Sequence, residues 1–371
     1  MGGAPWGGSE ALWYNIAMHA LQQGDAIFIS VYDWRKPHEK LKELQEKGAV
    51  IHYRKKYDAH AGRLEKIKRF VQNRKPVLNK DYQSIIDFKP GAVFISQGES
   101  FDLAIHHRPL YDLLRRHNIS YSFICHSHAQ YSFIPPVEIY PAAIEVFKNA
   151  KQVFFVSQRQ WKLTERRLAM KISNGYFTWN PLNITMPEFA LSWPEDQTVQ
   201  MAIVGNISGG KGHDTAIEVL SAPQWKERKW ILNIYGDGEG KKYVEDLSLF
   251  YGIHHRINFY GHVTDLINVW EQNHLLLIPS AGEGLPISLA EAMACGRAAV
   301  VTDVGGNTEL ITENETGFIA VSPSTEAFAA AMEKAWNEKD NWRQLGINAI
   351  EKINWVLDRN PGEKIYKLLQ T

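Results

Sequence analysis

Two glutamates, Glu283 and Glu291, lie eight positions apart in a segment that predicts a strand, a tight loop and a helix. Residues 274–280 are typical of a buried strand, and the small apolar residues 287–295 after Pro286 are typical of a buried helix. The free N–H groups at such a helix start favour an anion such as a phosphate. A carboxylate on either side can accept hydrogen bonds from hydroxyl groups. A phosphate between two hydroxyl-rich groups describes a nucleotide-sugar.

A second candidate is Lys211, which follows Gly209 and Gly210 and precedes Gly212. This position favours a cation held over a diphosphate, and the chemistry needs one because a departing nucleoside diphosphate gains negative charge. A solvated loop lysine is the other interpretation of this residue. For the two glutamates, the other interpretation is a pair of helix-associated carboxylates that meet surface cations.

These segments resemble the retaining glycosyltransferases of the GT-B type, in particular glycosyltransferase family 4 (glycosyl transferases group 1). The E-x7-E signature from Glu283 to Glu291 carries the resemblance together with four further segments, which follow in the family's order over roughly residues 200–320. These segments are Val204–His213, Ile234–Gly238, Ile257–Val263 and Val301–Glu309. The first half of the chain matches the family more loosely.

The resemblance implies a role for each matching residue. Glu283 holds hydroxyls of the donor sugar, Glu291 holds the ribose hydroxyls, and Lys211 holds the diphosphate. A histidine that faces the donor sugar corresponds to His126, which with Glu283 and Lys211 completes the implied catalytic set, and His128 is the alternative. The remaining donor-binding positions lie in loops and turns: Gly7, Gly8, Gly205, Asn206, Gly236, His262, Val263, Gly284, Leu285 and Pro286.

Two features depart from the family pattern. Asn206 stands five positions before Lys211, where the family usually has an Arg, and an amide cannot offer the bidentate fork of a guanidinium. The glycine-rich residues 2–8 lead into a predicted helix over 11–21, with almost nothing before them, whereas the family has a central strand there. We therefore expect the first strand to be missing and a Val/Ile/Leu-rich stretch to be encoded upstream of Met1. A plain tight turn is the other interpretation of this loop.

Apolar strands and amphipathic helices alternate along the chain, which predicts an α/β protein with parallel sheets covered on both faces. We expect two Rossmann-like, doubly wound domains facing a cleft, the GT-B architecture. Residues 1–183 are expected to form the acceptor-side domain and residues 184–354 the nucleotide-sugar-binding domain. Residues 355–371 are predicted to be a helix, which the resemblance implies crosses back to the first domain.

Charge and cysteine content narrow the function classes. The 41 Lys and Arg balance the 41 Asp and Glu, so no net field points to nucleic acid. Two cysteines, Cys125 and Cys295, fit a reducing compartment, and we expect a cytoplasmic protein. The sequence has no Asp-x-Asp triplet in a metal-binding context and no Cys/His cluster with zinc spacing, so we expect neither a catalytic metal nor a cofactor.

One region is locally basic. Residues 35–80 hold fifteen Lys and Arg against five Asp and Glu. Its segment 54–75 is interpreted either as a solvated helix face or as a contact for an anionic acceptor or for the inner face of a membrane.

We therefore expect an enzyme of polysaccharide or glycoconjugate biosynthesis. It would move a hexose from a nucleoside-diphosphate sugar to a hydroxyl of a saccharide or lipid-linked acceptor, and the resemblance implies retention of the anomeric configuration. No carboxylate is clearly placed as a nucleophile, so direct front-face attack is the expected mechanism. Two alternatives stay open: a nucleotide-sugar epimerase or hydrolase on the same fold, and a non-catalytic sugar-nucleotide-binding protein, which Asn206 and the missing strand keep open.

Overall fold

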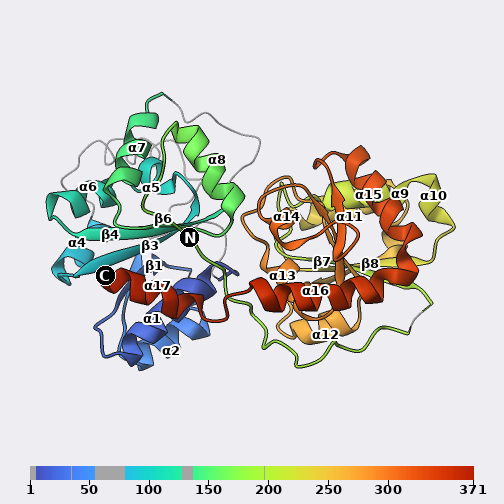
Figure 1. Ribbon diagram of the computed structural model, residues 1–371, viewed down its shortest axis with the longest axis horizontal. Helices are drawn as coiled ribbons and strands as arrows, with labels where there is room; N and C mark the ends of the chain where they lie inside the picture. The colour runs from blue at the N-terminus through green and yellow to red at the C-terminus, as the bar shows by residue number, and fades with distance from the viewer. Residues whose placement is uncertain (1–5, 35, 55–79, 128–136, 196) are drawn as a thin grey trace. The chain divides into compact units, whose positions relative to one another are not determined.

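The computed structural model describes residues 6–34, 36–54, 80–127, 137–195 and 197–371 (Figure 1). The chain divides into two compact units. The first holds the described residues up to Pro181 together with Arg359–Thr371, and the second holds Leu182–Asp358. His128 and, apart from Arg54, the basic segment 54–75 lie outside the described residues. No helix in the described ranges combines the length and apolar character that crossing a bilayer requires.

The first unit contains two parallel sheets flanked by helices. One sheet pairs β1 (Phe28–Tyr32) with β2 (Val50–Arg54). The other has the order β3 (Ala92–Glu99), β4 (Ser120–Ser127), β5 (Val153–Phe155) and β6 (Gly175–Phe177). The helices are α1 (Glu10–Gln22), α2 (Glu39–Glu46), α4 (Lys80–Asp87), α5 (Asp102–Ile105), α6 (Arg108–Arg116), α7 (Tyr140–Asn149), α8 (Gln158–Leu168) and α17 (Pro361–Gln370).

Aromatic side chains fill the core of the first unit. Phe123 of β4 and Phe155 of β5 are fully buried, and Phe147 of α7 meets Phe123 edge to face with ring centroids 5.0 Å apart. Alternate residues of β4 point to opposite faces, and both sets are buried because helices cover both faces.

The carboxyl-terminal residues return to the first unit, where α17 packs on α1. The ring of Tyr366 meets the ring of His19 at 4.9 Å, and its hydroxyl donates to Asp25 at 2.8 Å. The predicted helix over 355–371 starts later in the structure, at Pro361. A proline at the first helical position disfavours helical geometry at the residue before it, so Asn360 is non-helical, with φ −129° and ψ 53°, and α17 is separate from the preceding helix.

The second unit is a single parallel sheet in the order β12-β11-β10-β7-β8-β9. Its strands are β7 (Val199–Val204), β8 (Trp230–Tyr235), β9 (Ile257–Gly261), β10 (Leu275–Ile278), β11 (Ala298–Thr302) and β12 (Gly317–Ala320). Its helical segments are α9 (His213–Ser221), α10 (Pro223–Lys226), α11 (Lys241–Phe250), η1 (His254–Arg256), α12 (Leu266–Glu271), α13 (Ile287–Ala294), α14 (Asn307–Leu310), α15 (Thr325–Asn337), η2 (Lys339–Asn341) and α16 (Trp342–Val356).

Helices α9, α11 and α15 cover one face of this sheet, and α12, α13 and α16 cover the other (Figure 1). Every residue of β10 and β11 is buried, as expected for central strands of a parallel sheet. The predicted fold class, α/β with doubly wound parallel sheets, is therefore confirmed in this unit.

The buried Arg297, just before β11, hydrogen-bonds to backbone carbonyls of several segments of the second unit. Its guanidinium donates to the carbonyl oxygens of five residues: Ser192, Trp270, Asn273, Cys295 and Gly296. Ser192 belongs to the segment before β7, which has no regular secondary structure, so Arg297 links that segment to the sheet. Burial lowers the pKa of Arg297 to about 10, and the group stays charged at neutral pH.

Candidate functional site

The point where strand order reverses in the second unit lies between β7 and β10. From β7 the chain proceeds outward through β8 and β9, and then returns to β10 on the other side. Loops at the carboxyl ends of the two strands at such a switch point form the usual ligand crevice of an open α/β sheet. The loop after β7 carries Lys211 and the loop after β10 carries Glu283, so two predicted site residues meet at this position.

Backbone contacts fix the two loops against each other. The N–H of Ala281 donates to the carbonyl of Gly210 at 2.8 Å. Gly212 has a φ of +73°, and a Cβ there would lie 2.1 Å from the carbonyl oxygen of Pro279. Only glycine fits this position, which is also the N-cap of α9. Because Gly212 has no capping side chain, the amino-terminal N–H groups of α9 remain available to an anion.

Lys211 and Glu283 form an ion pair. The Lys211 Nζ lies 2.7 and 2.9 Å from the two carboxylate oxygens of Glu283. The Ser280 hydroxyl donates to Oε1 of the same carboxylate at 2.7 Å. The side chain of Glu283 is 8% exposed and that of Lys211 is 37% exposed. The ammonium group is thus oriented by a buried acid, yet it remains open enough to meet a second anion.

Two glycines after β11 contact the backbone of the Glu283 loop. Gly305 has a φ of +50°, and a Cβ there would lie 2.1 Å from the carbonyl oxygen of Glu283. The N–H of Gly306 donates to the carbonyl of Gly284 at 2.6 Å. The loop conformation that presents Glu283 therefore depends on a close backbone approach that a side chain at Gly305 would prevent. Leu285 and Pro286 are buried, and α13 begins directly after them.

Glu291 is buried on α13 with 2% of its surface exposed. The backbone N–H and the side-chain amide of Asn183 donate to its Oε1 at 3.0 and 3.1 Å. Burial raises the pKa of Glu291 to about 7, against the opposing effect of these two hydrogen bonds. Both bonds reach the same oxygen, so Oε2 keeps its capacity to accept a hydroxyl.

Asn206, Gly205 and Gly236 lie in adjoining loops at the ends of β7 and β8. Gly236 has a φ of +144°, and a Cβ there would lie 1.9 Å from the carbonyl oxygen of Gly205. Asn206 is exposed, and its Oδ1 lies 2.5 Å from the position of a Cβ on Gly238. The side chain at position 206 therefore projects from a loop that two glycines hold close to the next strand.

The turn after β9 joins the same row of loops. The N–H of Gly236 donates to the carbonyl of Gly261 at 2.7 Å, next to His262 and Val263. His262 is exposed and Val263 is half-buried. Positions 205–206, 211, 236, 262–263 and 283 thus all lie at the carboxyl end of one sheet.

His126 lies in the first unit, near the end of β4. It is buried, and its Nε2 lies 3.1 Å from the hydroxyl of Ser96 on β3. Burial lowers the pKa of His126 to about 4, so the imidazole is neutral at physiological pH.

Gly7 and Gly8 precede α1 in the first unit. The N–H of Gly7 donates to the carboxylate of Glu10 at 2.9 Å, and Ser9 donates to the same carboxylate. A carboxylate from the helix itself therefore occupies the anion position that the sequence assigned to a ligand at Gly7. Ser9 is the N-cap residue of α1, but its side chain accepts no capping hydrogen bond.

Three residues at the site were not singled out from the sequence. Asn183 and Ser280 bond to the two glutamates, and His213 is the first residue of α9. Both ring nitrogens of His213 are buried without a hydrogen-bond partner among the described residues. Burial, with a smaller contribution from the charge of Lys211, lowers the pKa of His213 to about 4. The sequence feature that could have indicated His213 was its position directly after Gly212.

A family model matches most of the second unit. Residues 189–352 match the family model described as glycosyl transferases group 1. An uncharacterized glycosyltransferase of Haemophilus influenzae is 27% identical over 47% of this chain and 49% of its own. A D-inositol 3-phosphate glycosyltransferase of Corynebacterium diphtheriae is 25% identical over 46% of this chain and 42% of its own. The chain thus spans about half the length of the curated relatives it matches.

A solved structure extends the likeness in fold to the whole chain. HepE of Anabaena, in complex with UDP and glucose, superposes with a TM-score of 0.73 at 14% identity and covers 100% of this chain and 98% of its own. Residues 189–352 therefore match the glycosyl transferases group 1 family, and the chain has the α/β fold of the GT-B glycosyltransferases.

Proposed function

We propose that this protein transfers a hexose from a nucleoside-diphosphate sugar to an acceptor hydroxyl, with retention of the anomeric configuration. The observation that carries the proposal is the Lys211–Glu283 ion pair at the switch point of the second sheet, with the buried Glu291 on α13, the helix that follows the Glu283 loop. A cation, a helix amino terminus and two carboxylates at one sheet edge suit a ligand with phosphates between two polyols.

Lys211, Glu283 and Glu291 would each bind a different part of the donor. The diphosphate would lie at the amino terminus of α9 and against the Lys211 ammonium, which would stabilise the charge that grows on the leaving group. Glu283 would accept hydrogen bonds from the hexose hydroxyls, and Glu291 would accept them from the ribose through Oε2. Lys211 already contacts Glu283, so the diphosphate and the sugar would be bound by adjoining groups.

In the first unit, His126 would act as a neutral hydrogen-bonding group toward the donor sugar. Its lowered pKa suits this role, because a neutral imidazole contributes no positive charge beside an oxocarbenium-like transition state. Attack of the acceptor hydroxyl would occur on the face from which the diphosphate departs, and a phosphate oxygen would take the hydroxyl proton. We propose that the reaction proceeds without a metal ion and that the acceptor is a saccharide or a lipid-linked saccharide.

The names of the comparison proteins support the donor class. The HepE structure contains UDP and glucose, and a relative is named for transfer to D-inositol 3-phosphate. For the present chain, a cytoplasmic location and a contact of residues 54–75 with an anionic membrane surface remain proposals.

The test uses a labelled donor and determines the anomeric configuration of the product. The protein is incubated with nucleotide-sugars and an acceptor panel, and the anomeric coupling constant of the product is read by NMR. We expect an α-linked product from an α-linked donor, and loss of transfer in Lys211→Ala but not in Lys226→Ala, an exposed lysine on α10. An inverted product would refute retention. Epimer or free sugar formed at equal rate without acceptor would favour the epimerase or hydrolase alternative.

A further inference from the structure

Arg54, the last residue of β2, carries a positive charge that no acid balances among the described residues. The register of the sheet places it opposite Tyr32, the last residue of β1. No ion pair between described residues involves its guanidinium. One of its terminal nitrogens lies 3.5 Å from the carbonyl oxygen of Ser30, beyond the usual hydrogen-bond range. Its Nε is buried and has no hydrogen-bond partner in the described parts of the chain.

Aromatic rings, not carboxylates, surround this guanidinium. Its central carbon lies 4.5 Å from the ring centroid of Tyr32 and 5.6 Å from that of Tyr82 on α4. The face of a tyrosine ring attracts a cation, but it offers the N–H groups no oxygen acceptor. An arginine that loses part of its hydration is normally paired with an acid, because an unpaired charge is costly to bury. Arg54 is half-buried and therefore keeps an unused capacity to bind an anion.

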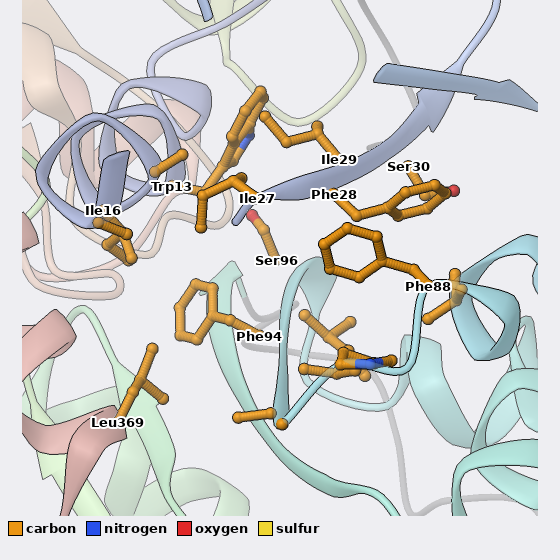
Figure 2. Close-up of a pocket in the computed structure, with 18 of the residues that line it drawn as sticks. Trp13, Ile16, Ile27, Phe28, Ile29, Ser30, Phe88, Phe94, Ser96 and Leu369 are labelled. Atoms are coloured by element: carbon orange, nitrogen blue, oxygen red, sulfur yellow. The ribbon is translucent and has the colours of Figure 1, made fainter. Parts of the chain in front are cut away.

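The groups around Arg54 belong to one face of the β1–β2 sheet. Alternate side chains of a strand share a face, so Phe28 and Ser30 lie on the same face of β1 as Tyr32. Figure 2 shows Phe28 and Ser30 with Phe88, just after α4, beside them, and the rings of Phe28 and Phe88 have centroids 5.3 Å apart. Helix α4 thus covers this face, and Arg54 lies at the carboxyl end of the covered strands.

Asp33 is close to Arg54 along the backbone but acts elsewhere. Its N–H donates to the carbonyl of Arg54 at 2.7 Å. Burial and, to a smaller extent, the charge of Asp33 raise the pKa of Tyr53. Because Tyr53 directly precedes Arg54 on β2, the two side chains point to opposite faces of the sheet. The charge of Asp33 is therefore felt by a side chain of the opposite face.

A neutral histidine completes the surroundings of the guanidinium. The hydroxyl of Tyr82 and Nδ1 of His107, the residue before α6, are 2.8 Å apart. Burial, with a smaller contribution from the positive charge of Arg54, lowers the pKa of His107 to about 3. The imidazole is neutral at physiological pH, so Arg54 is the charged group of this cluster.

The cluster is placed where α/β units bind ligands. Arg54, Tyr82 and His107 line a cavity of about 670 Å³ that residues of β1 and β3 also line. The groups suited to an anion belong to β2, α4 and the residue before α6, so they do not depend on how the space between β1 and β3 is filled. Ligands of open α/β sheets bind outside the carboxyl ends of the strands, and Arg54 stands at such an end.

We propose that Arg54 binds an anionic group of the acceptor substrate, a phosphate or a carboxylate, at the carboxyl end of β2. The planar fork of a guanidinium matches two oxygens of either group, and Tyr32 and Tyr82 would hold the fork in place. The ligand would thus be held by the first unit, which also carries His126. Calling it the acceptor rests on the proposed function, whereas the binding of an anion at Arg54 does not.

The test is an NMR titration of the isotope-labelled full chain with inorganic phosphate and with acetate. The backbone amides of Tyr82 and His107 report on anions near Arg54, and the amide of Gly212 reports separately on anions at α9. Arg54→Gln removes the charge, and Arg54→Lys keeps the charge without the fork. Arg115→Gln, which removes an exposed arginine from α6, is the matched control.

We expect saturable shifts at Tyr82 and His107, with affinity about tenfold or more weaker in Arg54→Gln, intermediate in Arg54→Lys and unchanged in Arg115→Gln. Absence of saturable shifts, or equal affinity in Arg54→Gln, would overturn the proposal. Without added anion, Arg54→Gln should be at least as stable in urea as the parent, because an unpaired charge is removed. A marked loss of stability would identify Arg54 as a structural residue and would also overturn the proposal.

Three hexoses that differ only in their terminal group separate the sources of the anion. Glucose 6-phosphate or glucuronate should shift the reporter amides more strongly than glucose, and Arg54→Gln should remove that preference. If vesicles of anionic phospholipid shift these amides while the small anions and the charged hexoses do not, the ligand is a membrane surface and the assignment to an acceptor is wrong. Anion binding at Arg54, with no nucleoside diphosphate bound at Gly212, would contradict the proposed function and would still support the Arg54 site.

Discussion

Replacing Glu291 by glutamine should make the protein more stable and a weaker binder of the donor. The carboxyl is buried, with both hydrogen bonds from Asn183 on one oxygen. Glu291→Gln keeps an oxygen for those bonds and removes the charge. It also replaces the second acceptor with an NH2 donor, which a ribose hydroxyl can meet only as a neutral partner.

The stability change follows from the pKa. Burial raises the pKa of Glu291 from 4.5 to about 7, so the fold favours the protonated form. The contribution of this group to stability is present below pH 4.5 and is lost as the pH rises through 7. Across that interval the loss is about 3 kcal/mol. Glutamine does not titrate, so Glu291→Gln should match the parent near pH 4.5 and exceed its stability by up to about 3 kcal/mol at pH 8.

The affinity change has the opposite sign. A hydrogen bond to a charged group contributes about 1.5–3 kcal/mol and a neutral one about 0.5–1.5 kcal/mol. We therefore expect nucleoside-diphosphate binding at pH 8 to weaken by roughly five- to tenfold in Glu291→Gln. The parent should lose affinity as the pH falls through 7, and the variant should show no such dependence.

Urea unfolding and calorimetric titration at several pH values measure both quantities. Glu351→Gln, an exposed change on α16, is the control and should alter neither. If Glu291→Gln is less stable than the parent at pH 8 and binds the diphosphate equally well, the glutamate is a structural hydrogen-bonding residue and the assignment to the donor fails.

Three other changes probe the remaining parts of the site and the fold. Asn206→Arg should tighten nucleoside-diphosphate binding several-fold in titration, because the exposed position beside Gly238 accepts a guanidinium near the phosphates; unchanged binding would mean that another cation already acts there. Transfer should continue at its full rate in excess chelator, because Lys211 and backbone N–H groups hold the diphosphate, and loss of activity that magnesium or manganese restores would refute this. Arg297→Ala should lower the free energy of unfolding, measured by urea denaturation, by several kcal/mol, because the carbonyls that share its guanidinium lose a buried charged donor. A drop of less than about 0.5 kcal/mol would show that water replaces the guanidinium.

The parts of the site that are formed by residues close together in the sequence were predictable. The loops of Lys211 and Glu283 could be identified because their signals come from neighbouring residues. These signals are glycines that allow a close backbone approach and a buried helix directly after a buried strand. The pattern also predicted α/β units with parallel sheets. The ion pair itself was not predicted, because it joins loops 72 positions apart.

The remaining features of the site depend on contacts between segments that are distant in the sequence, so they could not be predicted. Asn183 donates to Glu291 across 108 positions of sequence, and no local pattern distinguishes this asparagine from the other asparagines of the chain. The pKa of Glu291 depends on burial that follows only from the packed sheet. In the first unit, the cavity lined by residues of β1 and β3 could not be predicted, because it depends on how these distant strands are placed.

Calorimetric titration of the full chain with UDP, GDP, ADP and CDP tests the central claim most directly, since that claim is the binding of a nucleoside-diphosphate donor at the switch point of the second sheet. We predict that one nucleoside diphosphate binds saturably in the presence of chelator. We also predict that Lys211→Ala weakens this binding by about tenfold or more, whereas Lys226→Ala does not. Failure of all the diphosphates to bind, or binding that Lys211→Ala leaves unchanged, would contradict the account.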